Sequence, residues 1–293
     1  MLEKLASRQL IAVTGKGGVG KSTVSAVLGR LLSRSGRRTM LVEVDPRESL
    51  HALLDVPPSG GEILRAAPRL DLQHLDPTAV IDELVRSKLK VKAIADRVTS
   101  SPVHRHFVEG APGLKEAAIF GRCLRMVQGH MPRGATPPET VILDAPASGH
   151  GVQWMAAPQL VADVIQSGPV GQMATEVARF LGDTERFGVV VVTTAEEMPV
   201  QESLELLDAL RARTGRPPDL VVVNALYPPV EAAGDAEPSG TDLWRRRREI
   251  NDRELHRLQS SWTGPTARLP LLPVDVGPRL VSALADIFVS DVM

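Results

Sequence analysis

Residues 15 to 23 have the residue types and the spacing of a phosphate-binding loop, Gly15-Lys16-Gly17-Gly18-Val19-Gly20-Lys21-Ser22-Thr23. The glycines let backbone N–H groups turn inward around phosphate oxygens, and Lys21 can reach the β- and γ-phosphates. Ser22 offers a hydroxyl to Mg²⁺, and a helix that begins here points its positive end at the anion. We therefore predict that this segment binds a nucleoside triphosphate with Mg²⁺.

The loop carries a second lysine, Lys16, close to its start. The chain has 7 lysines against 27 arginines, so arginine is its usual cation. Lysine is a compact point charge on a flexible stem, whereas the planar fork of arginine is too bulky for a cradle of glycines. Lysine at positions 16 and 21 indicates that the geometry of the loop requires it at both.

Two aspartates, Asp45 and Asp144, each follow an apolar strand-like run. Hydrolysis of a triphosphate needs support for Mg²⁺ and an oriented water, and carboxylates at strand ends supply both. The alternative for each aspartate is a helix cap or a turn residue. Glu43 belongs to the same strand as Asp45, and we rank it lower because we interpret strand alternation as turning it away from the side of Asp45.

The chain alternates strand-like and helical patterns, with helical spacing at 21–35 and 199–213. Several strand-like runs are continuously apolar, as expected where helices cover both faces of a sheet. We predict an α/β fold: a doubly wound, mostly parallel sheet with a P-loop NTPase core and ligands at the carboxyl ends of its strands. The predicted strands are 9–14, 39–44, 140–144, 188–194, 219–223 and 267–272, with a possible extra edge strand at 70–75.

The stretch from 51 to 136 interrupts this alternation. Asp76-Pro77 is a typical helix start, with proline at the first helical position, and residues 111–113 open a second helix that runs to Val127. We expect a helical subdomain at 51–136, inserted into a P-loop ATPase domain that comprises residues 1–50 and 137–293.

The composition narrows the classes of function. A net charge of −1 gives no general attraction to nucleic acid or membrane, and aromatics at 3% argue against a base-stacking surface. The single cysteine, Cys123, excludes an internal disulfide and a multi-cysteine metal site within one chain. The N-terminus has no signal-peptide apolar segment and no apolar run has membrane-spanning length, so we expect a cytoplasmic protein.

Four consecutive arginines, at 245–248, lie in a segment of mixed charge with helical spacing. Such segments are usually solvated helices that carry ion pairs along their length. The alternative is a surface for an acidic partner or an anionic lipid headgroup.

Residues 15–23 resemble the deviant Walker A motif of the MinD/ParA/nitrogenase-iron-protein class of P-loop ATPases. Within that class, the chain most resembles the family of the arsenite-pump ATPase and the tail-anchored-protein targeting ATPase. Residues 45–50, D-P-R-E-S-L, are similar to the family's first switch, D-P-A-H-S-L. Residues 144–150, D-A-P-A-S-G-H, are similar to its second switch, D-T-A-P-T-G-H. Further similar segments are 75–77, 112–117, 194–202, 223–226 and 270–275, so the resemblance spans nearly the whole chain.

The resemblance implies catalytic roles for Asp45, Lys16 and Lys21. Asp45 would orient or activate the attacking water, Lys16 would reach across a dimer to the partner's nucleotide, and Lys21 would hold the β- and γ-phosphates. Ser22 would coordinate Mg²⁺ directly, and Asp144 would hold it through water.

The resemblance also implies which residues contact the nucleotide and which move with it. The switch residues would be Asp45 and Pro46 in the first switch and Gly149 and His150 in the second. The nucleotide-binding residues would be Gly15, Lys16, Gly17, Gly18, Val19, Gly20, Lys21, Ser22 and Thr23 (the last at the α-phosphate), together with Asn224, Pro273, Val274 and Asp275 around the adenine.

The role implied for Lys16 requires a homodimer. The resemblance implies that this dimer hydrolyses Mg-ATP and that ATP closes it to bind a client or partner protein. A hydrophobic membrane-protein segment is one such client. Met126, Met131, Met155, Phe120 and Trp154 either line a groove for it or are ordinary core residues.

Two alternatives stay open. One is a positioning ATPase of the ParA/MinD type, for which the apolar segment 280–289 would have to act as a membrane-surface helix. The other is a weakly hydrolysing subunit paired with a paralogue, suggested by Arg47 and Glu48, which replace the small residue and the histidine of the first switch. We expect no nucleic-acid partner and no stable membrane insertion.

The chain departs from its relatives in its cysteines. The targeting relatives hold their dimer with zinc through a C-x-x-C pair, and the arsenite pump uses a cluster of cysteines as soft ligands. Cys123 alone provides neither. We therefore expect neither a zinc-bridged dimer nor arsenite transport.

Overall fold

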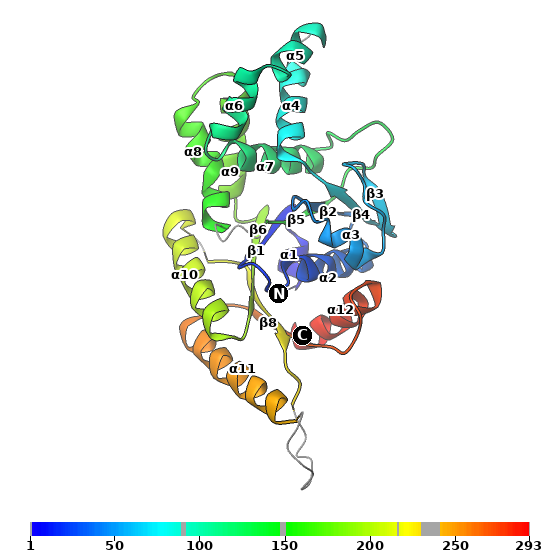
Figure 1. The fold of residues 1–293 in the computed structure, drawn as a ribbon, viewed down its shortest axis with the longest axis vertical. Coiled ribbons are helices and arrows are strands. Elements are labelled where there is room, and N and C mark those ends of the chain that lie inside the picture. The colour runs from blue at the N-terminus through cyan, green and yellow to red at the C-terminus, as the bar shows by residue number, and fades with distance from the viewer. Residues whose placement is uncertain (1, 89–91, 147–150, 216, 230–240, 293) are drawn as a thin grey trace.

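A sheet of eight strands runs through the middle of the protein, with helices on both of its faces (Figure 1). The computed structural model describes residues 2–88, 92–146, 151–215, 217–229 and 241–292. The strand order is β3-β4-β2-β5-β1-β6-β7-β8, and every neighbouring pair is parallel except β3 and β4. The strands are β1 (Leu10–Gly15), β2 (Thr39–Glu43), β3 (Leu64–Ala67), β4 (Leu70–His74), β5 (Thr140–Asp144), β6 (Phe187–Thr194), β7 (Leu220–Leu226) and β8 (Thr266–Pro270).

The helices divide between the two faces because the strands are apolar on both. Buried side chains of α1, α2, α3 and α12 form one core layer, and those of α7 to α11 form the other. The helices are α1 (Leu2–Ala6), α2 (Lys21–Arg34), α3 (Ser49–Leu54), α4 (Pro77–Lys88), α5 (Lys92–Thr99), α6 (Pro102–Gly110), α7 (Leu114–Val127), α8 (Gly151–Val164), α9 (Gly168–Gly182), α10 (Glu197–Thr214), α11 (Thr241–Ser261) and α12 (Pro278–Val292). The predicted doubly wound, mostly parallel α/β sheet is confirmed.

The predicted extra strand at 70–75 exists as β4, but it is not at the edge of the sheet. β4 pairs in parallel with β2, and the antiparallel strand β3 forms the edge beside it. Residues 64–74 are therefore strands of the central sheet, although the predicted domain division puts them in the helical subdomain.

The helical part of the protein contains more of the chain than expected. α4, α6 and α7 share a small apolar core, and α8 and α9 pack against α7 through a second one. In Figure 1 the helices α4 to α9 lie together at one end of the molecule, beyond the sheet. The first of these helices begins at Pro77, after β4, and the last two come from the stretch after β5. The division of the chain into two domains stays a proposal. In that proposal, helices α4 to α9 form the second domain.

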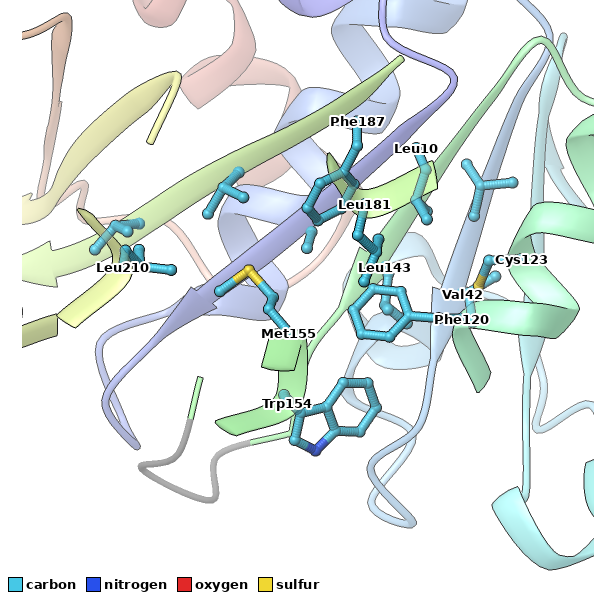
Figure 2. Close-up of a cluster of buried hydrophobic side chains, with 14 of the residues drawn as sticks. Leu10, Val42, Phe120, Cys123, Leu143, Trp154, Met155, Leu181, Phe187 and Leu210 are labelled. Atoms are coloured by element: carbon cyan, nitrogen blue, oxygen red, sulfur yellow. The ribbon is translucent and has the colours of Figure 1, made fainter. Parts of the chain in front are cut away.

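The methionines and aromatics that we considered for a client groove are core residues, so the groove interpretation of them is wrong. Phe120 of α7 lies edge-on to Trp154 of α8 and to Phe187 of β6, with ring centroids 5.7 and 6.2 Å apart (Figure 2). Met126 and Met155 are buried in the same cluster, and Met131 packs against it. These side chains attach the helical layer to the sheet.

Two surface interpretations are also decided by packing. The apolar side of α12 lies in the core beside α2, with Val281, Leu284 and Phe288 buried, so this face is not available to a membrane surface. The arginine run on α11 carries ion pairs with acidic side chains, which confirms the ion-paired helix. These pairs are Arg245–Asp242, Arg247–Glu196 and Arg248–Asp252. Within the described part of the chain, no helix combines the length and the apolarity that crossing a membrane requires.

A buried ion pair joins the strands at the amino edge of the sheet. Arg8, just before β1, donates from Nη2 to Oδ1 of Asp219, just before β7, over 2.8 Å. The other oxygen of Asp219 accepts the backbone N–H of Val189 in β6 at 3.0 Å. The carbonyl of Arg8 accepts the hydroxyl of Thr140 at the start of β5. The charged pair therefore links the starts of β1, β6 and β7, and the backbone of Arg8 adds the start of β5.

We expect Arg8→Ala to lower the free energy of unfolding by about 3–5 kcal/mol, because the buried Asp219 carboxylate loses its buried hydrogen-bonded cation and keeps only the exposed Lys4, 3.8 Å away. Arg34→Ala is the matched control, since Arg34 pairs with Asp286 at the surface and should cost at most about 1 kcal/mol. Urea unfolding followed by circular dichroism measures both. Equal losses for the two variants would contradict the importance of the buried pair.

Candidate nucleotide-binding site

The predicted phosphate-binding loop connects β1, in the centre of the sheet, to the first turn of α2. Its glycines are required by close contacts. Gly15 has φ +146°, and a Cβ there would lie 2.2 Å from the carbonyl oxygen of Val192 in β6. Gly20 has φ +90°, and a Cβ there would lie 2.1 Å from the side-chain nitrogen of Asn224. Left-handed backbone and lack of space both exclude other residues at these positions.

Asn224, near the end of β7, contacts the phosphate loop through its side chain. Its Nδ2 donates to the carbonyl of Val19 over 3.0 Å, and both side chains are buried. The structure thus places Asn224 against the phosphate loop, whereas we predicted it at the adenine. A role at the adenine stays a prediction.

The carboxylate of Asp144, at the end of β5, is held by two hydroxyls of α2. Ser22 Oγ donates to Oδ2 over 2.6 Å and Ser25 Oγ donates to Oδ1 over 3.0 Å. Burial raises the pKa of Asp144 to about 6, although both hydrogen bonds and the nearby Lys21 lower it. The sequence analysis missed Ser25. The signal for it is its position three residues after Ser22, on the same face of the helix.

Lys21 is the buried cation of the site. Its Nζ donates to the backbone carbonyl of Lys16 over 2.9 Å, so the ammonium group lies inside the turn of the loop. Burial lowers the pKa of Lys21, and the charges of Asp144 and Asp45 act in the opposite direction. The three predicted residues Lys21, Asp45 and Asp144 are therefore electrostatic neighbours at the carboxyl edge of the sheet.

Asp45 lies in a tight turn after β2. Its Oδ1 accepts the backbone N–H of Arg47 at 3.0 Å, and Nε of the same arginine is 3.6 Å away. Pro46 is exposed beside it, and Glu48 has a left-handed backbone, with φ +49°. Gly149 and His150, predicted as second-switch residues, lie outside the described residues.

Lys16 has a different environment from Lys21. Its side chain is 47% exposed, and its ammonium group forms an ion pair with Glu202 on α10. Gly17 and Gly18 are exposed next to it. The second lysine therefore lies on the outer side of the loop, whereas Lys21 occupies the inner side.

The position of Glu43 differs from our interpretation, whereas its rank below Asp45 as a residue of hydrolysis stays a prediction. Positions 43 and 45 are two apart, so continued alternation puts them on the same side of the strand, and our interpretation of them as opposed was wrong. Glu43 is the register partner of Asp144. Burial is the largest cause that raises the pKa of Glu43, to about 7; the backbone N–H of Leu50 lowers this pKa, and the charges of Asp144 and Asp45 raise it further.

Pro273, Val274 and Asp275 follow β8, some distance along the sheet edge from β1. With Val276, Arg279 and Ala283 they line an open hollow of about 670 Å³. Within the ranges that the structure describes, no hydrogen bond or ion pair joins them to the phosphate loop. Their predicted contact with the adenine stays a prediction.

The donor set fits Mg²⁺ bound together with a triphosphate. Mg²⁺ prefers oxygen ligands and is usually bound by one or two carboxylates, several waters and substrate phosphates. The hydroxyl of Ser22 and the buried carboxylate of Asp144 supply such oxygens beside Lys21, which complements the phosphates.

Comparison with known proteins identifies a family and several relatives. A family model described as anion-transporting ATPase matches residues 8–176. ATPase BagA of Mycobacterium tuberculosis is 29% identical over 241 residues, which cover 77% of this chain and 67% of that protein. The arsenical pump-driving ATPase of Acidiphilium multivorum is 25% identical over 293 residues, covering 90% of this chain and 46% of that protein. ATPase GET3 of Chaetomium globosum is 26% identical over 211 residues, covering 70% of this chain and 58% of that protein.

Glu43 makes a testable contribution to the pH dependence of stability without Mg²⁺ and nucleotide. Because its pKa is raised from 4.5 to about 7, the folded protein binds this proton more tightly than the unfolded chain does. The resulting stabilisation is complete below the unfolded pKa and is lost as the pH rises through about 7. Between about pH 5 and pH 8, the natural protein should therefore lose roughly 1–3 kcal/mol more than Glu43→Gln does.

Urea unfolding of both proteins across this pH range measures the difference. Glu139→Gln serves as the control, because Glu139 is half-exposed just before β5, at the amino end of that strand, and its pKa is lowered by the backbone N–H of Arg38. Parallel curves for the natural protein and Glu43→Gln would mean that Glu43 is already charged at pH 5 in the fold.

Proposed function

The chain belongs to the anion-transporting ATPase family and is an ATPase, and from this premise we propose that it works as a Mg²⁺-dependent dimeric switch, which ATP closes to hold a client protein. The observation that carries the proposal is the set of contacts around Asp144. A buried carboxylate bonded to Ser22, beside the buried Lys21, couples the metal side of the site to the phosphate loop.

In this proposal each side chain has one task during hydrolysis. Lys21 and the backbone N–H groups of the loop hold the β- and γ-phosphates, and Asp45 orients the water that attacks the γ-phosphorus. Ser22 and, through water, Asp144 would hold Mg²⁺, which would neutralise charge on the phosphate oxygens. The proton of the attacking water leaves toward Asp45 or the phosphate itself.

The dimer is proposed from the position of Lys16. Its ammonium group lies on the outer side of the loop in an ion pair with Glu202, while Lys21 already supplies the inner charge. A cation brought in from a second subunit stabilises the charge of the transferring phosphoryl group only when two subunits close. We propose that Lys16 exchanges Glu202 for the partner's nucleotide on closure, in a homodimer.

The client site is proposed on the helical part, at an apolar groove between α6 and α8. The groove has a volume of about 530 Å³, and its lining includes Phe107, Leu114, Leu160, Val161, Val164 and Ile165. His106 is the one titratable side chain in that lining. Phe107, Leu160 and Val164 are exposed there, although large apolar side chains favour burial. A hydrophobic segment of another protein is the occupant that matches this chemistry.

One observation favours a second candidate, a weakly hydrolysing subunit that pairs with a more active paralogue. The backbone and guanidinium of Arg47 both approach the Asp45 carboxylate, the group proposed to orient water. An aspartate engaged in this way is less available to the water. In this case the closed dimer contains two different chains.

The first prediction concerns turnover and closure. Asp45→Asn should lower kcat by about 10²-fold or more, because it removes the group that orients water.

With ATP and Mg²⁺ the Asp45→Asn protein should sediment as a dimer. Adding Lys16→Ala should return it to a monomer, whereas adding Lys115→Ala, a lysine of α7, should not. Analytical ultracentrifugation distinguishes these outcomes. A dimer that persists after Lys16→Ala would contradict the cross-subunit role of Lys16. If the protein with intact Lys16 is a monomer in every nucleotide state and forms a dimer only when a co-purifying paralogue is added, the second candidate is favoured.

The second prediction concerns the groove. An ATP-loaded Asp45→Asn protein should bind a fluorescent peptide with an apolar helical segment of about 20 residues, the length that spans a bilayer. Val164→Ser combined with Phe107→Ser should weaken this binding at least about tenfold, since two apolar contacts are lost. Leu243→Ser on α11 is the control, because Leu243 is 63% exposed and Val164 74%. Unchanged binding after the groove substitutions would exclude this groove as the client site.

A further inference from the structure

A second group of polar side chains, two of them buried, lies next to the phosphate site and has no task in the proposed mechanism. It consists of Glu43 at the end of β2, with His51 on α3 and Glu48 just before that helix. Glu43 is fully buried and His51 nearly so. The loop between β2 and α3 is the first switch, which contains Asp45. The group therefore lies where the switch leaves the sheet and where it returns to a helix.

The Glu43 carboxyl connects these two ends of the loop. Its Oε1 accepts the backbone N–H of Leu50 at 2.9 Å, and its Oε2 is 3.2 Å from Nδ1 of His51. The same His51 nitrogen lies 3.4 Å from an oxygen of Glu48. Residues seven and eight positions apart along the chain are thus fixed against each other across the loop.

Burial of a carboxyl group is costly unless hydrogen bonds compensate for lost water. The position two residues before Glu43 on the same face of β2 is the apolar Leu41, which belongs to the core beneath α2. A branched apolar residue would fill the same position at lower cost. The carboxyl group is therefore explained by what it binds, the first turn of α3, rather than by packing.

The geometry also restricts where Asp45 can lie. Asp45 is two residues after the anchored Glu43, and its own carboxylate accepts the N–H of Arg47. The loop then reaches Leu50, which is bonded back to Glu43. Only a short arc of chain remains between these fixed points, and its position relative to Lys21 follows from them.

We propose that Glu43 is the positioning residue of the first switch: by holding the first turn of α3 against the end of β2, it keeps Asp45 facing Lys21 and Asp144. The inference rests on the role proposed for Asp45. Glu43 acts through Asp45 and touches no phosphate.

The test compares Glu43→Ala with Glu43→Gln. Glu43→Ala should lower kcat by about 10- to 100-fold while the KM for ATP changes less than about twofold, because misplacement of a water-orienting group affects the chemical step. Glu43→Gln should recover most of kcat, since its amide oxygen can still accept the N–H of Leu50. Gln73→Ala is the control for lost stability: Gln73 is also buried near a strand end and holds a loop carbonyl, that of Gly61. It should leave kcat within about twofold.

A double-mutant comparison separates this inference from the proposed function. In the Asp45→Asn background, Glu43→Ala should cause no further loss of kcat, because the residue it positions is already inactive. An additional full loss, or a loss of kcat after Gln73→Ala equal to that after Glu43→Ala, would overturn the positioning role. Normal turnover by Asp45→Asn itself would instead overturn the role of Asp45 in the proposed function.

Discussion

The hydrogen bonds between the buried carboxylate of Asp144 and helix α2 are the interaction on which the phosphate site depends. A buried carboxylate needs hydrogen-bond donors, and here both come from one helix, since Ser22 and Ser25 lie on the same face of α2. These bonds fix the rotation of α2 about its own axis and therefore where the phosphate loop ends. Asn224 then supports the loop from β7, so that three strands, β1, β5 and β7, set its position.

The sequence predicts the parts of this arrangement that are local in the chain. The loop of glycines between an apolar strand and a helix predicts the phosphate site, and continuous apolar runs predict strands covered on both sides. Contacts between distant segments are harder to infer. The bonds from Ser25 to Asp144 and from Asn224 to Val19 depend on how α2 and β7 sit on the sheet. Glu43 was within reach of sequence reasoning, because a period of two already places it beside Asp45.

Residue type alone did not distinguish core from groove in the helical part. Phe120 and Trp154 have the chemistry of either, and they became core because α7 and α8 turn them toward the sheet. Phe107 and Val164 are equally apolar, but they are left exposed at the surface of their own helices. Which side of a short amphipathic helix meets the sheet is decided by tertiary packing. The same packing seals Cys123 in the core, where burial raises its pKa to about 12.

The ion pair of Arg8 and Asp219 has a consequence for motion. It lies at the amino ends of the strands, whereas the phosphate loop, Asp45 and Asp144 lie at their carboxyl ends. The strands are therefore linked to one another by side chains at their amino ends. The loop movements that we propose for the switch would involve only the carboxyl ends of the strands. The contacts that hold the strands together and the residues of the nucleotide site therefore lie at opposite ends of the same strands.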